Sequence, residues 1–248
     1  QIAAPDYRRP ELLPAGGVLI VGAAATGVQL ADEIQRSGRQ VTLSVGRHTR
    51  LPRLHRGRDI LWWLDRLGVL SQSADEVEDI DRSRHQPSMQ LVGRSDRASL
   101  DLRILHDAGV RLVGRIRSVD GHRARLADDL VSTTSAADIK MADVLTRIDQ
   151  FIATTGIEAG PPEPFTPTWP LAAGTPTRLD LNHEGIETVI WATGCRRTYP
   201  WLHVPVLDAR GEIRHIGGIT SEAGLYVLGM SFQRQRNSSF IDGVGRDA

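Results

Sequence analysis

The residues best suited to chemistry are three small ones at fixed spacing, Gly22, Ala24 and Gly27, which follow the apolar run 18–21. In a turn that binds a pyrophosphate, the first small residue turns the chain. The second lets the backbone approach the phosphates, and the third lets a helix pack on a strand. Ala24 departs from glycine at the middle position. A plain strand-to-helix turn also favours small residues, so both interpretations stay open.

The whole turn is predicted to take part in binding. Its residues are Gly22, Ala23, Ala24, Ala25, Thr26 and Gly27. A helix beginning near Ala25 would aim free backbone N–H groups and its positive dipole end at bound phosphates. The turn therefore favours an anionic ligand.

The end of the next predicted strand, 39–47, indicates which dinucleotide is bound. The residues predicted to contact it there are Ser44, Arg47, His48 and Arg50. NAD-specific sites place an Asp or Glu here to accept from the ribose 2′-OH, and this segment has none. Guanidinium groups pair with phosphate oxygens, so Arg47 and Arg50 predict NADPH rather than NADH. The alternative is that both arginines are solvated loop charges.

The elements that must position these residues form a βαβ unit: strand 16–22, helix 26–38 and strand 39–47. Other predicted segments are helix 56–70, loop 71–90, helix 97–108, strand 110–120 with a turn at Asp120-Gly121, strand 122–128, helix 135–155, proline-rich loop 160–177, and strands 185–194 and 224–230. This alternation predicts an α/β fold, a Rossmann-like doubly wound parallel sheet with helices on its faces.

Composition excludes several classes. Formal net charge is zero, with 30 basic and 30 acidic residues, so no nucleic-acid or membrane partner is expected. The single cysteine, Cys195, excludes an internal disulfide, a CxxC redox pair and a cysteine zinc cage, and it suits a cytoplasmic protein. No metal-ligand spacing and no Ser-His-Asp arrangement recurs. The polar opening, without Met, and the closing residues 238–248, which look like part of a helix, suggest a piece of a longer protein.

Four blocks together resemble the flavin-containing monooxygenases of the bacterial class B type. They are residues 7–34, 41–53, 189–194 and 224–248. The resemblance is specific in these blocks and weak between about 70 and 185. It implies two nested dinucleotide-binding domains, one for FAD and an inserted one for NADPH, and Gly22, Ala24 and Gly27 match the second.

The resemblance also implies a domain division and further cofactor contacts. Residues 1–15 would be a linker from an FAD domain, 16–185 the NAD(P)-binding domain, and 186–248 the C-terminal portion of the FAD-binding domain. Thr193 and Gly194 match the segment that returns to the FAD domain. The backbone near Phe240 and Ile241 would approach the flavin. Because no other glycine-rich strand-to-helix turn occurs, the chain is expected to hold NADPH more readily than FAD.

In the resembled family NADPH reduces FAD, and the reduced flavin then activates O₂. The alternative function is a non-catalytic NADP-binding fragment. We expect no nucleophilic role for Cys195 without a placed base. His48 and His55 are interpreted as exposed loop histidines, and Trp62 and Trp63 as core packing rather than a substrate channel. Catalytic residues, the small-molecule substrate and the oligomeric state, a homo-oligomer included, stay open.

Overall fold

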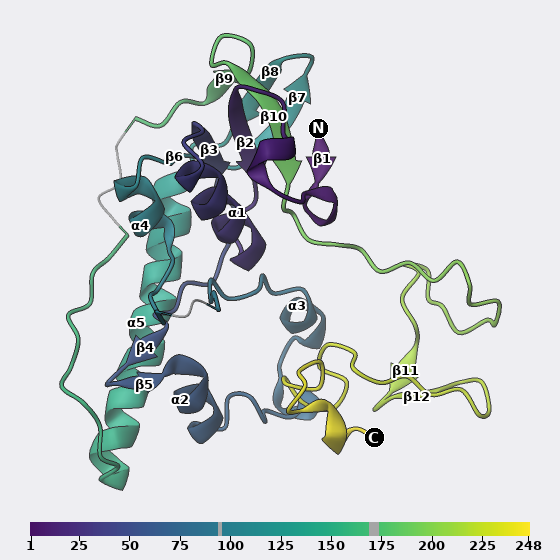
Figure 1. The fold of residues 1–248 in the computed structure, drawn as a ribbon. Coiled ribbons are helices and arrows are strands. Elements are labelled where there is room, and N and C mark those ends of the chain that lie inside the picture. The colour runs from purple at the N-terminus through teal and green to yellow at the C-terminus, as the bar shows by residue number, and fades with distance from the viewer. Residues whose placement is uncertain (94–95, 169–173) are drawn as a thin grey trace. The chain divides into compact units, whose positions relative to one another are not determined.

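A computed structural model of the chain describes residues 1–93, 96–168 and 174–248 (Figure 1). The chain divides into two compact units. The first comprises residues 1–60 and 87–194, and the second comprises residues 61–86 and 195–248.

The first unit is built on a five-stranded parallel sheet. In spatial order its strands are β1 (Ile2–Ala3), β10 (Ile186–Trp191), β2 (Gly17–Val21), β3 (Val41–Ser44) and β6 (Arg111–Val113). Every residue of β2 and β3 is buried, as their continuous apolar character predicts for inner parallel strands. The predicted α/β class with a mainly parallel sheet is confirmed.

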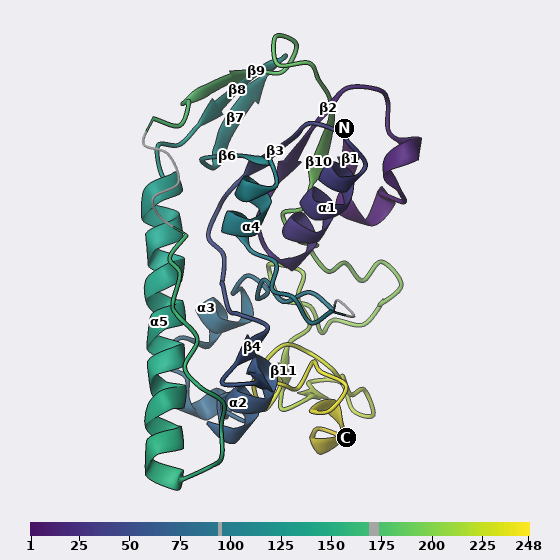
Figure 2. The ribbon, with the colours of Figure 1, turned by 60° about the vertical axis from the view of Figure 1, so that its left-hand side comes forward.

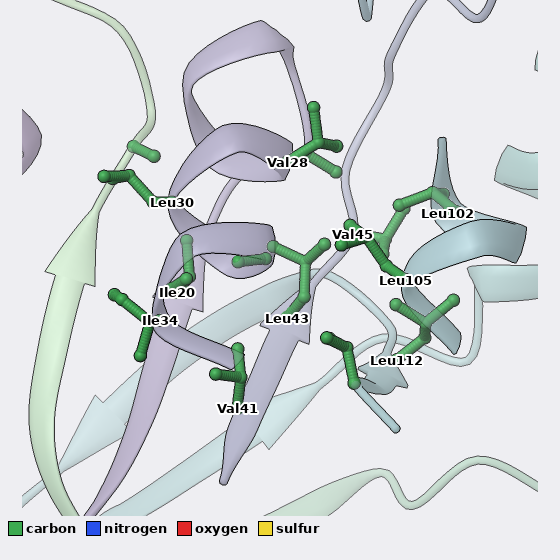
Figure 3. Packing of buried hydrophobic residues seen from close by; sticks show 14 of the residues in the cluster. Ile20, Val28, Leu30, Ile34, Val41, Leu43, Val45, Leu102, Leu105 and Leu112 are labelled. Carbon is green, nitrogen blue, oxygen red and sulfur yellow. The ribbon is translucent and has the colours of Figure 1, made fainter. Parts of the chain in front are cut away.

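Two helices cover one face of this sheet, α1 (Ala25–Arg36) and α4 (Leu102–Asp107). Figure 3 shows the core between them and the strands, where Val28 and Ile34 of α1 approach Leu43 of β3. The apolar residues of α1 recur at helical spacing on its buried side, which is why this helix could be predicted from sequence.

An antiparallel sheet covers the other face, where helices were expected. Its strands are β7 (Ile116–Asp120), β8 (Arg123–Leu126) and β9 (Arg178–Asp180). Leu19 and Val21 pack against Leu126 and Leu179 in a second apolar cluster. The predicted turn at Asp120-Gly121 joins β7 to β8. The predicted strand 110–120 is divided at Gly114, where a Cβ would lie 1.9 Å from the Ala127 carbonyl oxygen.

Helix α5 (Leu130–Thr155) is the longest element and begins five residues before the predicted helix 135–155. It ends at Gly156, whose φ of 68° suits glycine. The proline-rich segment 160–177 that follows was predicted as a loop or linker, and its first part, 160–168, runs back alongside α5 (Figure 2). Residues 169–173 of that prediction lie outside the described residues.

The proline-rich segment is fastened to the rest of the first unit. The Thr168 N–H donates to Asp138 Oδ2 at 2.6 Å, and the Gly160 N–H donates to the Arg56 carbonyl at 2.9 Å. Arg56 closes the tight turn between β4 (Leu54–His55) and β5 (Arg58–Asp59). The stretch 160–168 is therefore a bound part of the unit and not a free linker.

The second unit contains only short elements. They are α2 (Ile60–Arg66), which starts at its border, η3 (Ala74–Glu76), α3 (Ile80–Arg84), β11 (His215–Ile216), β12 (Ile219–Thr220) and η4 (Val244–Arg246). The predicted strand 224–230 is reduced to an isolated bridge between Ile219 and Tyr226, because Gly224 and Gly229 both adopt positive φ. The helix expected at 238–248 is limited to η4.

The N-terminal stretch of the first unit contains two short 3-10 helices, η1 (Ala4–Asp6) and η2 (Pro10–Leu12).

Candidate functional site

The glycine turn between β2 and α1 requires its two outer glycines. Gly22 has φ +109°, and a Cβ there would lie 2.5 Å from the Ala192 carbonyl oxygen. A Cβ on Gly27 would lie 1.8 Å from the carbonyl oxygen of Gly22, so only glycine lets α1 pack this closely on the turn. The middle position tolerates Ala24, which has ordinary extended angles.

The N-terminus of α1 carries the features of an anion site. Ala24 is the N-cap, and no side chain caps the helix. The first N–H groups of a helix have no partner within it, and they coincide with the positive end of the dipole. Ala24 and Ala25 are half-buried and Thr26 is exposed, whereas Ala23 is buried beneath the turn.

The end of β10 lies directly beside this turn. The Ala192 N–H donates to the Val21 carbonyl at 2.8 Å, and the exposed Thr193 and Gly194 follow. Strands β3 and β10 flank β2 on opposite sides, so the strand order reverses at β2. Ligands of open parallel sheets bind in the crevice outside such a switch point, at the carboxyl ends of the strands.

The residues predicted at the end of β3 separate into exposed and buried ones. Arg47 is exposed and forms no ion pair within the described residues. Ser44 is buried, and its hydroxyl donates to the Gly114 carbonyl at 3.1 Å and accepts from the Ile116 N–H at 3.2 Å. The two hydrogen bonds tie β3 to the β6–β7 connection and to the first residue of β7. The Ser44 hydroxyl therefore has no donor left for a cofactor, and this prediction is corrected.

Arg50 lies inside the unit, contrary to the prediction that it meets a phosphate. Its guanidinium donates to Asp101 Oδ2 at 2.8 and 3.0 Å and to Asp138 Oδ1 at 2.6 Å. It also donates to the Thr166 carbonyl at 2.8 Å. Arg50 is only 6% exposed, and its charge is paired with two buried carboxylates. The phosphate role is withdrawn for Arg50 and stays a prediction for Arg47.

The two histidines near this strand end are buried rather than exposed. His48 Nδ1 donates to the Gly46 carbonyl at 3.0 Å, and Nε2 has no partner among the described residues. Burial lowers the pKa of His48, so the neutral form is favoured. His55 lies between Asp149 and Glu163, with Nε2 3.1 Å from Asp149 Oδ1 and Nδ1 3.3 Å from Glu163 Oε2.

Sequence reasoning missed Gln90, which lies against the glycine turn. Its Nε2 donates to the Ala23 carbonyl at 2.6 Å, and its own N–H donates to the Thr49 carbonyl at 2.8 Å. The residue stands in a polar segment that carries no periodic signal, so nothing in the sequence separates it from a solvated loop glutamine.

The remaining predicted residues belong to the second unit. The Phe240 N–H donates to the Asn237 carbonyl at 2.8 Å, and the approach of the backbone near Phe240 and Ile241 to a flavin stays a prediction. Ile241 is fully exposed, and Cys195 is an exposed free thiol.

The two adjacent tryptophans lie on α2. Trp63 is fully buried and packs edge-on against Trp62, with ring centroids 4.7 Å apart, which agrees with core packing.

The parallel sheet with its glycine turn at the switch point defines an α/β protein of the Rossmann-like class. No protein-family model matches the chain. The chain is similar to two curated proteins, the uncharacterized oxidoreductase CzcO-like of Geobacillus kaustophilus, 27% identical over 250 residues, and the uncharacterized oxidoreductase CzcO of Bacillus subtilis, 25% identical over 249 residues. Each match covers 100% of this chain and 55% of the relative, so the chain spans about half the length of these relatives.

Among solved structures, the chain is similar to a mutant flavin monooxygenase from Stenotrophomonas maltophilia. The TM-score is 0.51 at 14% identity, and the match covers 98% of this chain and 51% of that one. At this identity the likeness shows the fold alone. The relatives are named as oxidoreductases, and a flavin monooxygenase shares the fold, which agrees with the resemblance stated from sequence.

The predicted domain boundaries differ from the compact units in three respects. Residues 1–15, expected to be a linker, belong to the first unit, where β1 joins the sheet. Residues 61–86, expected in the NAD(P)-binding domain, belong to the second unit. Residues 186–194, expected to open the C-terminal portion, belong to the first unit because β10 pairs with β2 along its length. Which cofactor each part serves stays a prediction. No helix in the described part of the chain combines the length and the apolar character needed to cross a membrane.

Proposed function

We propose that this chain binds NADPH, in preference to NADH, as part of a flavoprotein oxidoreductase of the monooxygenase type. The observation that carries the proposal is the glycine turn at the switch point of a parallel sheet, with an uncapped helix N-terminus above it. The oxidoreductase names of the relatives support the same class of chemistry.

Each part of the site has a proposed role. The backbone of residues 22–27 would hold the pyrophosphate, through the N–H groups at the start of α1, which no side chain caps. Thr193 and Gly194 would border the dinucleotide on the β10 side. Arg47 would pair with the 2′-phosphate, because it is an exposed cation shortly beyond the end of β3. The bound nicotinamide supplies a hydride, and the residues of this chain fix where that group lies.

FAD belongs to the proposal only for a complete protein, because the chain spans about half of its relatives. The second candidate function is a non-catalytic NADP-binding unit. It is favoured by one observation: among the described residues, 22–27 form the single glycine-rich turn that joins a parallel strand to an α-helix. The proposal also includes a cytoplasmic location and a small-molecule substrate whose identity is open. It includes no nucleic-acid or membrane partner.

The proposal is tested by calorimetric titration of NADPH and NADH into the purified chain. We expect the wild type to favour NADPH, and Arg47→Ala to weaken NADPH binding by about 1.5–3 kcal/mol while leaving NADH unchanged. Arg117→Ala removes another exposed arginine, on β7, and should change neither affinity. Equal wild-type affinities would contradict the NADPH preference, and binding of neither dinucleotide would contradict the proposed function.

The two candidate functions differ in a visible property. If this chain also holds flavin, the purified protein is yellow and its visible spectrum changes when NADPH is added without oxygen. A colourless chain that binds NADPH in the titration supports the non-catalytic unit. A chain that stays colourless after incubation with FAD and dialysis would remove flavin binding from this part of the protein.

A further inference from the structure

Gln90 has an unusual environment for an uncharged polar residue in a loop. It is 1% exposed, and its side chain reaches the glycine turn through a hydrogen bond from Nε2 to the Ala23 carbonyl at 2.6 Å. Its backbone is held independently. The Gln90 N–H donates to the Thr49 carbonyl, and Met89 forms a parallel bridge with Thr49. Gln90 therefore connects the segment beyond β3 to the turn that ends β2.

The orientation of this amide is determined by its partner. A carbonyl oxygen only accepts hydrogen bonds, so the nitrogen of Gln90 must face Ala23 and its oxygen must point elsewhere. That oxygen, Oε1, is buried without a partner among the described residues. An unpartnered buried oxygen costs stability. The bond to Ala23 is thus the hydrogen bond that offsets, in part, the cost of burying this side chain.

That bond also sets the direction of the next N–H group. The Ala23 carbonyl and the Ala24 N–H belong to one planar trans peptide, in which the two groups point in opposite directions. Holding the carbonyl toward Gln90 therefore turns the Ala24 N–H away from Gln90. Ala24 is the N-cap of α1 and the middle position of the turn, where the backbone approaches a pyrophosphate.

We propose that Gln90 is a positioning residue for pyrophosphate binding, acting through the peptide between Ala23 and Ala24. The inference rests on the proposed dinucleotide-binding function and extends it to a residue outside the turn. Because every NAD(P) dinucleotide contains the pyrophosphate, Gln90 should support NADPH and NADH equally. Arg47, in contrast, should affect NADPH alone.

The first test replaces Gln90 with Met, which has similar length and no donor. We expect NADPH and NADH to bind about three- to tenfold more weakly, by the same factor. The matched control is Gln35→Met, since Gln35 Nε2 also donates to a backbone carbonyl, that of Ala108, at the far end of α1. Circular dichroism and thermal unfolding establish that each variant is folded. A folded Gln90→Met variant with wild-type affinities overturns the role of Gln90.

The second test measures dinucleotide affinity as a function of pH. A contact that only stabilises the fold would not make the affinity of a Gln90 variant, relative to wild type, depend on pH. In Gln90→Glu a carboxylate faces the Ala23 carbonyl at pH 8, so binding of both dinucleotides should be weaker than in Gln90→Met. Protonation at lower pH gives this side chain an O–H donor, so its affinity relative to wild type should recover toward pH 5. A ratio that does not change with pH overturns the proposal, and this test stands even if Gln90→Met does not fold.

The outcomes also separate the two proposals. If the wild type binds neither dinucleotide, the proposed function fails and the role of Gln90 fails with it. If the wild type binds NADPH and the Gln90 variants bind it equally well at every pH, only the role of Gln90 is overturned.

Discussion

Arg50 Nη1 lies 2.6 Å from Asp138 Oδ1, which joins the loop after β3 to the first half of α5 across 88 residues of sequence. The same guanidinium pairs with Asp101, the N-cap of α4. One buried cation therefore ties two helices to the end of the strand that borders the glycine turn. Arg50 therefore stabilises the arrangement of α4, α5 and the loop after β3 around the site.

Removal of this cation should strongly destabilise the protein. Arg50→Met leaves two carboxylates buried without their partner, and breaking a buried pair in this way costs about 3–5 kcal/mol. Denaturant unfolding measures the loss. Arg36→Met is the control, because its pair with Asp32 is on the surface and is worth less than about 1 kcal/mol. Similar losses for both variants would mean that the Arg50 cluster contributes little.

Gly27→Ala should damage both the fold and the site. Its Cβ would lie 1.8 Å from the Gly22 carbonyl oxygen, so α1 must shift from the turn, and overpacking of this kind costs about 1–3 kcal/mol. Thermal unfolding and NADPH titration report the two effects. Gly93→Ala provides the comparison, since a Cβ there meets nothing within 4 Å. A Gly27→Ala variant with unchanged stability would show that α1 does not pack as described.

Ala24→Gly should strengthen dinucleotide binding. The change removes the methyl group at the position where the backbone approaches the pyrophosphate, and glycine is also a better N-cap than alanine. We expect tighter binding of both NADPH and NADH in calorimetry, by a few-fold, with no loss of thermal stability. Ala24→Val serves as the opposite control and should weaken both. Weaker binding by the glycine variant would indicate that the ligand does not approach this position.

His48 should make the protein less stable in acid. Burial lowers its pKa in the folded state below the ordinary value of 6.5, so the unfolded chain binds the proton more readily. The stabilising contribution is complete above pH 6.5 and is lost as the pH falls through the folded pKa, with a slope of at most about 1.4 kcal/mol per pH unit. Arg50, Asp101 and Asp138 also act on this titration.

The measurement is the free energy of unfolding between about pH 7.5 and 5 for wild type and His48→Phe. The variant should show a shallower decline. His215, whose pKa is lowered by burial and by Arg84, contributes with the same sign and is present in both proteins. His106→Gln, which changes an exposed histidine, is the control for removal of an imidazole. Identical slopes for wild type and His48→Phe would contradict the assignment.

The centre of the fold could be predicted because its signals are local. An apolar run, two glycines and an amphipathic helix follow one another directly in the sequence, and the two glycines have a steric cause in the structure. The antiparallel sheet on the other face could not be predicted in full. Its third strand, β9, joins β8 across the whole of α5 and the proline-rich segment, and no local pattern marks that pairing.

Side-chain roles were harder to predict than strands and helices. Arg47 and Arg50 stand in one polar stretch, yet one is exposed and the other is paired with carboxylates 51 and 88 residues distant. The role of Gln90 and the burial of His48 and His55 were missed for the same reason. The partners that bury them come from other parts of the chain, and composition alone gives no sign of them.

The attachment of the proline-rich segment to α5 has a consequence for how this region can vary. Three separate hydrogen bonds hold this stretch to the unit, at Thr168, Glu163 and Gly160. They fix the number of residues that the chain needs between these points. Deletion of even one residue between these anchors would pull on Asp138, and through it on Arg50. Substitutions in residues 160–168 should therefore be tolerated more readily than insertions or deletions.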